Sequence, residues 1–388
     1  MEILIKKVYS DFSTAENRQK LLDKIFIQLG KFEIDLIESE SSEFQALLIL
    51  TGGTEKAALE IINNRKDTFA KTILLTHNSY NSLPAALEIA AYLHEQNILA
   101  EIIALEADDV SEKLQKSLSE NDFLLNKRIG VIGKPSDWLI ASSHSAEIVK
   151  ISWGASLVNI EISRLQKLIE ASQITDVELP EEDIIEPCKQ DFINSEKIYQ
   201  ALKIIIKEEN LQAITLRCFD LVMEMQMTAC SALARLNAEN IPAGCEGDIA
   251  SVTGMLWAQK QTGFIPWMAN PSRIDKAKSS LILAHCTAPL NYLKNVVYRS
   301  HFESGIGIGV QGDLDFAEVT IFRLGGKNLD KIWIAEGKVL RHLKEPDLCR
   351  TQIEIVLSPE KLENLLAEPL GNHLLILPGN YSDKLKKQ

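Results

Sequence analysis

The chain is poor in aromatic residues, and it has fewer basic residues than acidic ones. Phe, Trp and Tyr make up 6% of the 388 residues, and 41 Lys and Arg face 54 Asp and Glu. The formal net charge of −13 repels phosphate backbones, so we expect no nucleic-acid partner. No apolar run approaches the roughly 20 residues that span a bilayer, so we expect no membrane partner either.

Cysteine is also sparse, and no two cysteines form a Cys-x-x-Cys pair that would suggest a zinc ribbon or a redox motif. The six residues are Cys188, Cys218, Cys230, Cys245, Cys286 and Cys349. The start of the chain, MEILIKK, is typical of a first strand rather than of a signal peptide. We therefore expect reduced thiols and a cytoplasmic protein instead of a disulfide framework.

The length predicts two or three domains, and 46% hydrophobic with 24% charged residues is typical of soluble globular proteins. In the first part, short apolar runs alternate with segments of helical spacing. The apolar runs are 44–50, 72–76, 98–105, 128–132 and 147–151, and the helical segments are 55–63 and 83–96. This alternation predicts an α/β domain over residues 1–165, with a parallel sheet covered on both faces.

An acidic, poorly periodic connection at 172–191 leads to a second α/β pattern, which predicts a domain over residues 166–290. Its expected helices are 195–208, 225–237 and 247–259, and its expected strands are 213–219 and 280–284. Beyond Pro289 the character changes to short β-rich runs separated by glycines and turns. These runs, at 318–323, 331–335, 351–357 and 373–377, predict a mainly antiparallel β-domain over residues 291–388.

One carboxylate and two histidines form a candidate metal site. Glu246 lies between Gly244 and Gly247, whereas His285 and His373 lie on later, strand-like segments. With the amide oxygen of Asn270, these side chains could coordinate Mn²⁺, Co²⁺ or Mg²⁺, and the mixed donor set does not select sharply among them. Lone histidines more often pack or form hydrogen bonds, so spacing alone leaves both interpretations open.

The segment GKPSDWLI, residues 133–140, follows a predicted strand and is rich in functional groups. Ligands of open α/β sheets favour the carboxyl ends of strands. Trp138 could therefore stack on an apolar ring face, and Ser136 could hold a substrate hydroxyl. A helix cap by Ser136 and a core position for Trp138 are the structural alternatives.

Six segments together resemble the L-fucose isomerase-like proteins, which are related to the L-fucose and L-arabinose isomerases. They are GKPSDWLIAS (133–142), AGCEGDIASVTGML (243–256), AHCTAP (284–289), SHFESGIGIGVQG (300–312), VTIFRLGG (319–326) and GNHLLILPGN (371–380). The resemblance implies two Rossmann-like α/β domains followed by a C-terminal β-barrel-like domain, in a homo-oligomer that is a trimer or hexamer. It also implies a small-molecule sugar substrate and Mn²⁺-assisted aldose–ketose isomerisation.

The same resemblance assigns roles to individual residues. The family's metal-binding carboxylate corresponds to Glu246, its C-terminal metal histidine to His373, and a histidine that faces the metal to His285. Position 270 departs from the pattern, because related sequences carry an acidic residue where this chain has Asn270. Asparagine keeps an oxygen ligand but has no titratable proton and one less negative charge than an acidic residue, so metal affinity should fall.

An isomerase of this kind moves a proton between neighbouring carbons through a cis-enediol, with carboxylates as proton carriers. We therefore predict Glu246 as metal ligand and base, acting alone or with Asp248, Glu303 or a metal-bound hydroxide. The other predicted site residues are Asn270 and His373 as metal ligands, His285 as ligand or proton partner, and Trp138, Ser136, His301 and Arg323 as substrate contacts.

Two other functions fit the same residues. The first is a non-catalytic carbohydrate-binding protein on an isomerase scaffold. Asn270 favours it, because a protein can keep the fold of an enzyme after it has lost the catalytic residues. A lyase or epimerase that uses the same enediolate would need the same groups.

Overall fold

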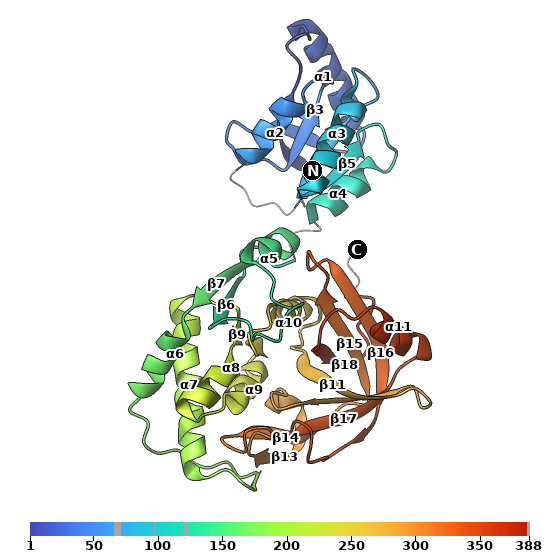
Figure 1. The fold of residues 1–388 in the computed structure, drawn as a ribbon. Helices are drawn as coiled ribbons and strands as arrows, with labels where there is room; N and C mark the ends of the chain where they lie inside the picture. Colours follow the sequence, from blue (N-terminus) through green and yellow to red (C-terminus); the bar gives the residue numbers. More distant parts are fainter. Residues whose placement is uncertain (66–70, 97, 120–122, 386–388) are drawn as a thin grey trace. The chain divides into compact units, whose positions relative to one another are not determined.

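The computed structural model describes residues 1–65, 71–96, 98–119 and 123–385. They form two compact units (Figure 1). The first unit comprises Met1–Leu125 with Lys150–Gly154, and the second comprises Asn126–Val149 with the described residues from Ala155 onward. All residues of the candidate site lie in the second unit.

The first unit is a five-stranded parallel sheet in the order β2-β1-β3-β4-β5. Its elements are β1 (Glu2–Val8), α1 (Ala15–Gly30), β2 (Asp35–Glu38), β3 (Ala46–Ile49), α2 (Glu55–Asn63), β4 (Lys71–Thr76), α3 (Ser82–Glu95), β5 (Leu99–Ala104) and α4 (Val110–Ser119). Leu48 and Leu75 belong to one buried cluster, whereas their neighbours Leu47 and Leu74 belong to another. Successive residues thus point to opposite, covered faces, which confirms the predicted parallel sheet.

The apolar run at 147–151 is helical, and its expected place among the strands was wrong. It forms the middle of α5 (Ala146–Trp153). Val149 and Trp153 are four residues apart and both are fully buried, as on one face of a helix. A run of five residues is too short to show whether its period is 2 or 3.6.

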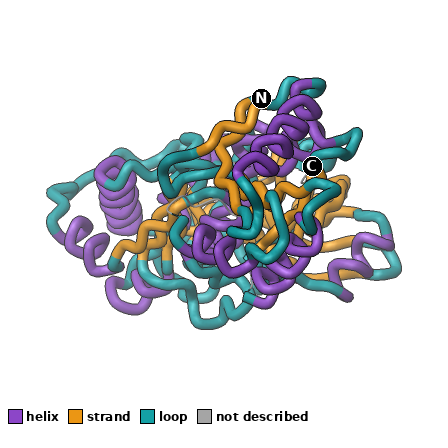
Figure 2. Tube along the Cα trace, turned by 90° about the horizontal axis from the view of Figure 1, so that it is seen from above, coloured by secondary structure: helices purple, strands orange, loops and turns teal. Residues whose placement is uncertain are grey.

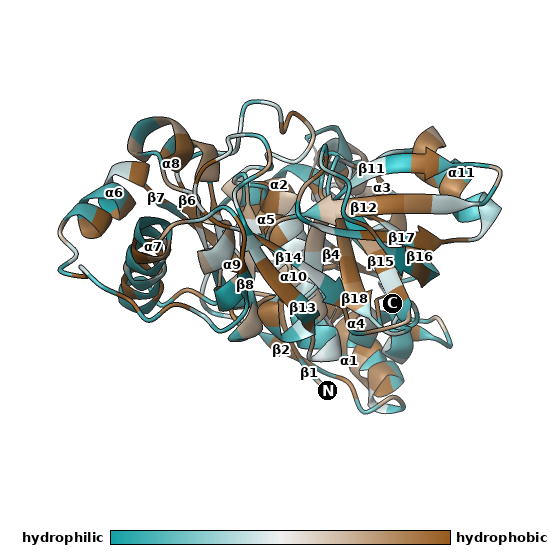
Figure 3. Ribbon diagram, turned by 90° about the horizontal axis from the view of Figure 1, so that it is seen from below, coloured by the Kyte–Doolittle hydropathy of each residue, from teal (hydrophilic) through white to brown (hydrophobic). Residues whose placement is uncertain are grey.

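The second unit contains a four-stranded parallel sheet in the order β10-β9-β6-β7. Its elements are β6 (Arg128–Ile132), β7 (Ser156–Ile160), α6 (Ile162–Glu170), α7 (Lys189–Glu208), β9 (Ala213–Leu216), α8 (Cys218–Met225), α9 (Cys230–Ala238), β10 (Ala243–Cys245) and α10 (Ile249–Thr262). Helices α6 and α7 carry both hydrophilic and hydrophobic residues (Figure 3), as expected for helices with one buried side.

Helix α10 differs because residues 249–258 are all buried. It contacts β9 and β10 of the sheet and also β15 (Glu318–Gly325) and β18 (Leu374–Pro378). A Cβ at Gly254 would lie 2.7 Å from Leu375 Cδ1, so this glycine permits the close approach of α10 to β18. The helix therefore joins the parallel sheet to the β-rich part of the unit.

Six antiparallel strands form a closed barrel in the order β11-β12-β17-β16-β15-β18. The elements of this β-rich part not yet given are β8 (Asp183–Ile184), β11 (Trp267–Asp275), β12 (Ser280–His285), the 3₁₀ helix η1 (Leu290–Tyr292), β13 (Leu293–Arg299), β14 (Gly309–Leu314), β16 (Lys331–His342), β17 (Thr351–Val356) and α11 (Pro359–Ala367). Figure 2 distinguishes strands from helices along the trace. The barrel core includes Trp267, Leu283 and Ile376, so the predicted antiparallel β-structure is confirmed.

Residues 280–284 were expected to complete the second α/β unit, and this assignment was wrong. They form most of β12, which pairs antiparallel with β11 and β17 of the barrel. All six residues of β12 are buried. Its sequence therefore lacks the alternation of polar and apolar residues that would distinguish an antiparallel barrel strand from a strand of a buried parallel sheet. None of the helices in the described ranges combines the length and apolar character needed to cross a membrane.

Candidate functional site

Glu246 lies in a strained turn between β10 and α10. Its φ is +62° and that of Gly247 is +71°, so two successive residues adopt the left-handed region. A Cβ at Gly247 would lie 2.6 Å from the carbonyl oxygen of Lys134, so only glycine fits there. The Ser136 N–H donates to the carbonyl of Glu246 at 2.9 Å. The turn is thus held by the segment that follows β6, which gives the carboxylate a defined position.

The two histidines come from the ends of barrel strands. His285 is the last residue of β12, and its Nδ1 lies 2.9 Å from Thr287 Oγ1. His373 precedes β18 and is fully buried, with Nδ1 2.9 Å from Asp248 Oδ2. The two imidazole rings lie with centroids 5.8 Å apart.

Glu246, His285 and His373 converge. One ligand atom from each residue lies within 4.8 Å of those from the other two. His373 Nε2 is 3.4 Å from Glu246 Oε1 and, among the described residues, has no hydrogen-bond partner. A buried nitrogen left without a partner is costly unless another group satisfies it. The three donors therefore fit a divalent cation, with one carboxylate oxygen and two imidazole nitrogens.

The protonation of this cluster follows from burial and from its neighbours. Burial raises the pKa of Glu246, but the nearby charge of His373 and the hydrogen bond from Trp138 outweigh it and hold the pKa below its usual value. Burial lowers the pKa of His285 to about 4, so its ring is neutral near pH 7 and keeps a free electron pair. A carboxylate and a neutral imidazole are the forms that bind metals. Burial lowers the pKa of His373, but Asp248 and Glu246 outweigh it and raise the pKa, so a metal would displace a proton from this ring.

Asp248 supports the cluster from behind. It caps α10 by accepting a hydrogen bond from the Ser251 N–H at 2.7 Å, and it holds His373. Arg323 Nη1 donates to Asp248 Oδ2 at 3.1 Å, and this pair is almost completely buried. Burial raises the pKa of Asp248, yet the charges of Arg323 and His373 hold it well below its ordinary value. The carboxylate thus stays ionised and fixes the orientation of the His373 ring.

The predicted site residues fall into two groups. A cavity of about 490 Å³ is lined by Glu246, His285, Asn270, Trp138 and His301. Trp138 Nε1 donates to Glu246 Oε2 at 2.6 Å, and its ring meets Phe219 edge-on at 5.2 Å. The volume is in the range of small-molecule sites.

The other predicted residues lie behind the cavity wall. His373 contacts Glu246 from there, and Arg323 lies 1% exposed among Asp248, Ser251 and Ser142. The hydroxyl of Ser136 is buried and unpartnered among the described residues, whereas its backbone holds the Glu246 turn. These residues position the groups that face the cavity.

Sequence reasoning missed the thiols of this cavity. Five of the six cysteines line it: Cys218, Cys230, Cys245, Cys286 and Cys349. Two of them adjoin Glu246 and His285 in the sequence, which was an available signal. Glu303 also lines the cavity and supplies a second carboxylate.

Comparisons with known proteins point to sugar isomerases. Sulfoquinovose isomerase from Alkalicoccus urumqiensis is 26% identical over 211 residues, which cover 51% of this chain and 47% of that protein. The sulfoquinovose isomerases from Priestia aryabhattai and Priestia megaterium are each 26% identical over 209 residues, with the same coverage. The chain spans about half the length of the curated relatives it matches.

No protein-family model matches the chain. Among solved structures, a D-threo-3-hydroxyaspartate dehydratase from Delftia sp. HT23 aligns over 96% of this chain and 89% of its own, at 10% identity and a TM-score of 0.15. That similarity is too low to inform the fold. The sequence relatives support the expectation that the protein is related to sugar isomerases.

Proposed function

We propose that the protein is a metal-dependent aldose–ketose isomerase of a monosaccharide. The observation that carries the proposal is the convergence of Glu246, His285 and His373, of which the first two line a cavity of about 490 Å³. The sugar isomerases among the sequence relatives support the same reaction type. The reaction breaks the C2–H bond of an aldose, forms a cis-enediol, and returns a proton to C1 to give the ketose.

Glu246, His285 and His373 would hold the metal, with Asn270 as a further oxygen donor from the cavity wall. When bound, a divalent ion such as Mn²⁺ polarises the substrate carbonyl and its neighbouring hydroxyl. His285 is neutral near pH 7 and fits the role of ligand or proton acceptor for a hydroxyl. His373 is held in its orientation by Asp248.

Glu246 would remove the C2 proton. Its carboxylate is ionised near neutral pH because its pKa lies below the usual range. Trp138 donates a hydrogen bond to one of its oxygens, which orients the carboxylate toward the cavity. A base must be both deprotonated and within reach of its proton, and Glu246 meets the first requirement and lines the cavity.

Glu303 would take the role that an acidic residue at position 270 has in related sequences. It lines the cavity, whereas Asp248 is fully buried and paired with Arg323 and His373. Of the two carboxylates that could help Glu246, only Glu303 is therefore exposed to a bound sugar. Its part would be the transfer of a proton between the hydroxyls at C1 and C2.

NMR spectroscopy of aldoses in D₂O tests the reaction directly. A panel of neutral aldoses and sulfoquinovose, each with Mn²⁺, should include one sugar that gains deuterium at C1 or C2 and yields a ketose. Exchange that returns a C2 epimer would instead identify an epimerase, and cleavage products would identify a lyase. A sugar that binds but never exchanges would identify the non-catalytic binding protein and refute the proposal.

Glu246→Gln should abolish exchange while leaving the fold intact, since the amide has almost the same size but cannot accept the proton. Glu345→Gln is the matched control, because that carboxylate pairs with Arg273 on the surface and does not line the cavity. Full activity of Glu246→Gln on the true substrate would eliminate Glu246 as the base.

A further inference from the structure

A second group of possible ligands meets in the same cavity and shares no residue with the first. Cys230, Cys286 and His301 each offer one atom within 4.8 Å of the other two, and all three residues are buried. They also line the cavity. The isomerase reaction proposed above uses neither of these two thiols, so their position in the cavity needs a separate explanation.

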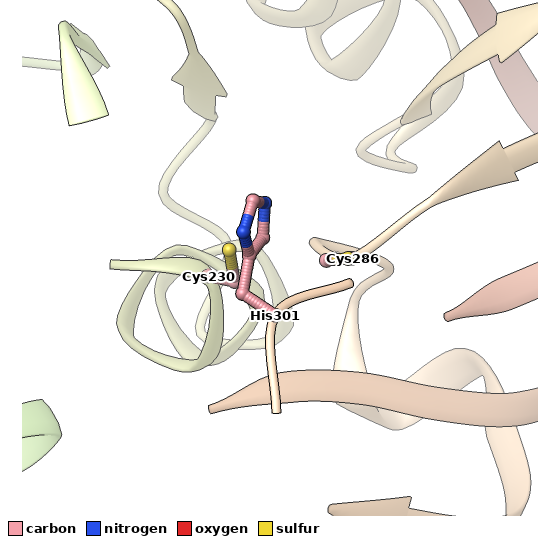
Figure 4. Close-up of side chains that lie close together, drawn as sticks. All are labelled: Cys230, Cys286 and His301. Carbon is pink, nitrogen blue, oxygen red and sulfur yellow. The ribbon is translucent and has the colours of Figure 1, made fainter. Parts of the chain in front are cut away.

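Three separate segments supply these side chains (Figure 4). Cys230 is the first residue of α9, Cys286 directly follows β12, and His301 lies in the loop between β13 and β14. The fold thus brings distant parts of the sequence to one point. Local spacing such as Cys-x-x-Cys does not occur, so a motif search would miss the cluster.

The distances suit a small tetrahedral ion. Zinc binds thiolate sulfur at about 2.3 Å and imidazole nitrogen at about 2.0–2.1 Å, which places tetrahedral donors roughly 3.5–3.8 Å apart. A spread within 4.8 Å needs only a small contraction to reach this. Two thiolate sulfurs and one imidazole nitrogen are donors that zinc and copper prefer, whereas the oxygen-containing set at Glu246 also suits Mn²⁺ and Mg²⁺.

The surroundings hold the donors in place. The backbone N–H of Arg350 donates to Cys286 Sγ at 3.5 Å, as backbone N–H groups do around metal-bound thiolates. His301 Nδ1 lies 3.0 Å from Ser304 Oγ and accepts from the Ser304 N–H at 3.4 Å, and these contacts fix the orientation of the imidazole ring. Cys349 also contacts Cys286 and adds a third thiol beside the group.

We propose that Cys230, Cys286 and His301 form a second metal site that binds Zn²⁺, distinct from the oxygen-containing site of Glu246, His285 and His373. Three protein ligands leave a fourth tetrahedral position, and because the ligands line the cavity, that position is open to water or to a sugar hydroxyl. The bound ion would also tie α9 to two loops of the β-rich part.

Cobalt substitution tests the proposal, because a sulfur-ligated Co²⁺ shows thiolate-to-metal charge-transfer absorption that an oxygen and nitrogen site lacks. Full-length, tag-free protein is stripped with a chelator under reducing, oxygen-free conditions and titrated with Co²⁺, then with Zn²⁺. We expect the charge-transfer band to appear with one equivalent of cobalt and to disappear as zinc displaces it. Folded protein that binds Co²⁺ without this band would overturn the proposal.

Variants locate the site. Cys230→Ser and His301→Asn should each weaken zinc binding by more than the roughly 10–100-fold that loss of an outer hydrogen-bond partner costs. Cys188→Ser, an exposed cysteine outside the cavity, and Cys218→Ser, a buried one that contacts Cys245 instead, are the matched controls and should keep the band. A band lost in Cys218→Ser and kept in Cys230→Ser would place the metal elsewhere and refute the assignment.

The result is independent of the isomerase proposal. Glu246→Gln should keep the charge-transfer band even though it abolishes proton exchange, because it leaves all sulfur donors in place. If a Cys230 variant does not fold, sulfur neighbours of zinc in the X-ray absorption spectrum of the unmodified protein still decide the question. A spectrum with only oxygen and nitrogen neighbours would contradict the site.

Discussion

Replacement of Arg323 by methionine tests how strongly the buried ion pair behind the site stabilises the second unit. Arg323 and Asp248 have side-chain exposures of 1% and 0%, and their closest atoms are 3.1 Å apart. Methionine keeps much of the aliphatic volume but leaves the Asp248 charge buried without its cation. Loss of one partner of a buried pair typically costs roughly 3–5 kcal/mol. His373 still contacts Asp248, so we expect the lower end, about 3 kcal/mol.

The matched control is Arg273→Met, on the barrel strand β11. Arg273 pairs with Glu345 at 2.7 Å, but the two side chains are 57% and 31% exposed. Water solvates both charges and screens their attraction, so this substitution should cost at most about 1 kcal/mol. The two variants therefore compare the same chemical change at a buried and at an exposed position.

Urea unfolding followed by tryptophan fluorescence measures the difference. Four of the five tryptophans, Trp138, Trp257, Trp267 and Trp333, lie in the second unit, so the signal reports mainly on it. Arg323→Met should lower the transition midpoint at an unchanged slope. An equal, small shift for Arg323→Met and Arg273→Met would refute the reasoning.

The pH dependence gives an independent readout. Burial raises the pKa of Asp248, but Arg323, His373 and the Ser251 N–H together lower it by more. The pKa of Asp248 is therefore lower in the folded state than in the unfolded state. Such a group stabilises the fold when the pH is above its pKa in the unfolded state, which is about 4. This stabilisation is lost as the pH falls toward the pKa in the folded state. Arg323→Met should therefore lessen the loss of stability below about pH 4.

Three further predictions concern the site. Gly247→Ala should destabilise the protein by at least about 1 kcal/mol more than Gly263→Ala in thermal unfolding, because both have positive φ but only Gly247 would also clash with Lys134. Trp138→Phe should lower the kcat of sugar isomerisation about tenfold, since it removes the hydrogen bond to ionised Glu246; unchanged kcat would show that this bond plays no part. Chelation with EDTA should abolish isomerisation and Mn²⁺ should restore it, whereas activity that survives verified metal removal would exclude a metal-dependent reaction.

Local sequence patterns predicted many of the strands and five of the eleven helices in the described ranges, because an element's own residues contain that information. Helix α2 and strand β6 begin and end where the sequence predicted them. Strand β11 was missed, since its run WMANPSRID contains a proline and several polar residues that are depleted in strands. Strand β12 was identified as a strand but assigned to the wrong sheet, because its partners are far away in the sequence.

The candidate site shows the same division. Glu246, His285 and His373 were named from the sequence because chemical type and motif context distinguish them. Their convergence depends on a turn with positive φ and on the ends of two barrel strands, which local sequence does not specify. The roles of Arg323 and Asp248 were equally out of reach, because burial of a charge depends on what packs over it.

The sequence by itself determined the class of the protein: acidic, without an apolar run long enough to cross a membrane, first α/β and then β-rich, with a carboxylate and two histidines as candidate ligands. Only the tertiary structure decided which side chains meet. It separated Glu303, on the cavity, from Asp248, behind it, and it gathered Cys230, Cys286 and His301 from three segments. The physical reason is that periodicity reports contacts within one element, whereas a site is built from contacts between elements.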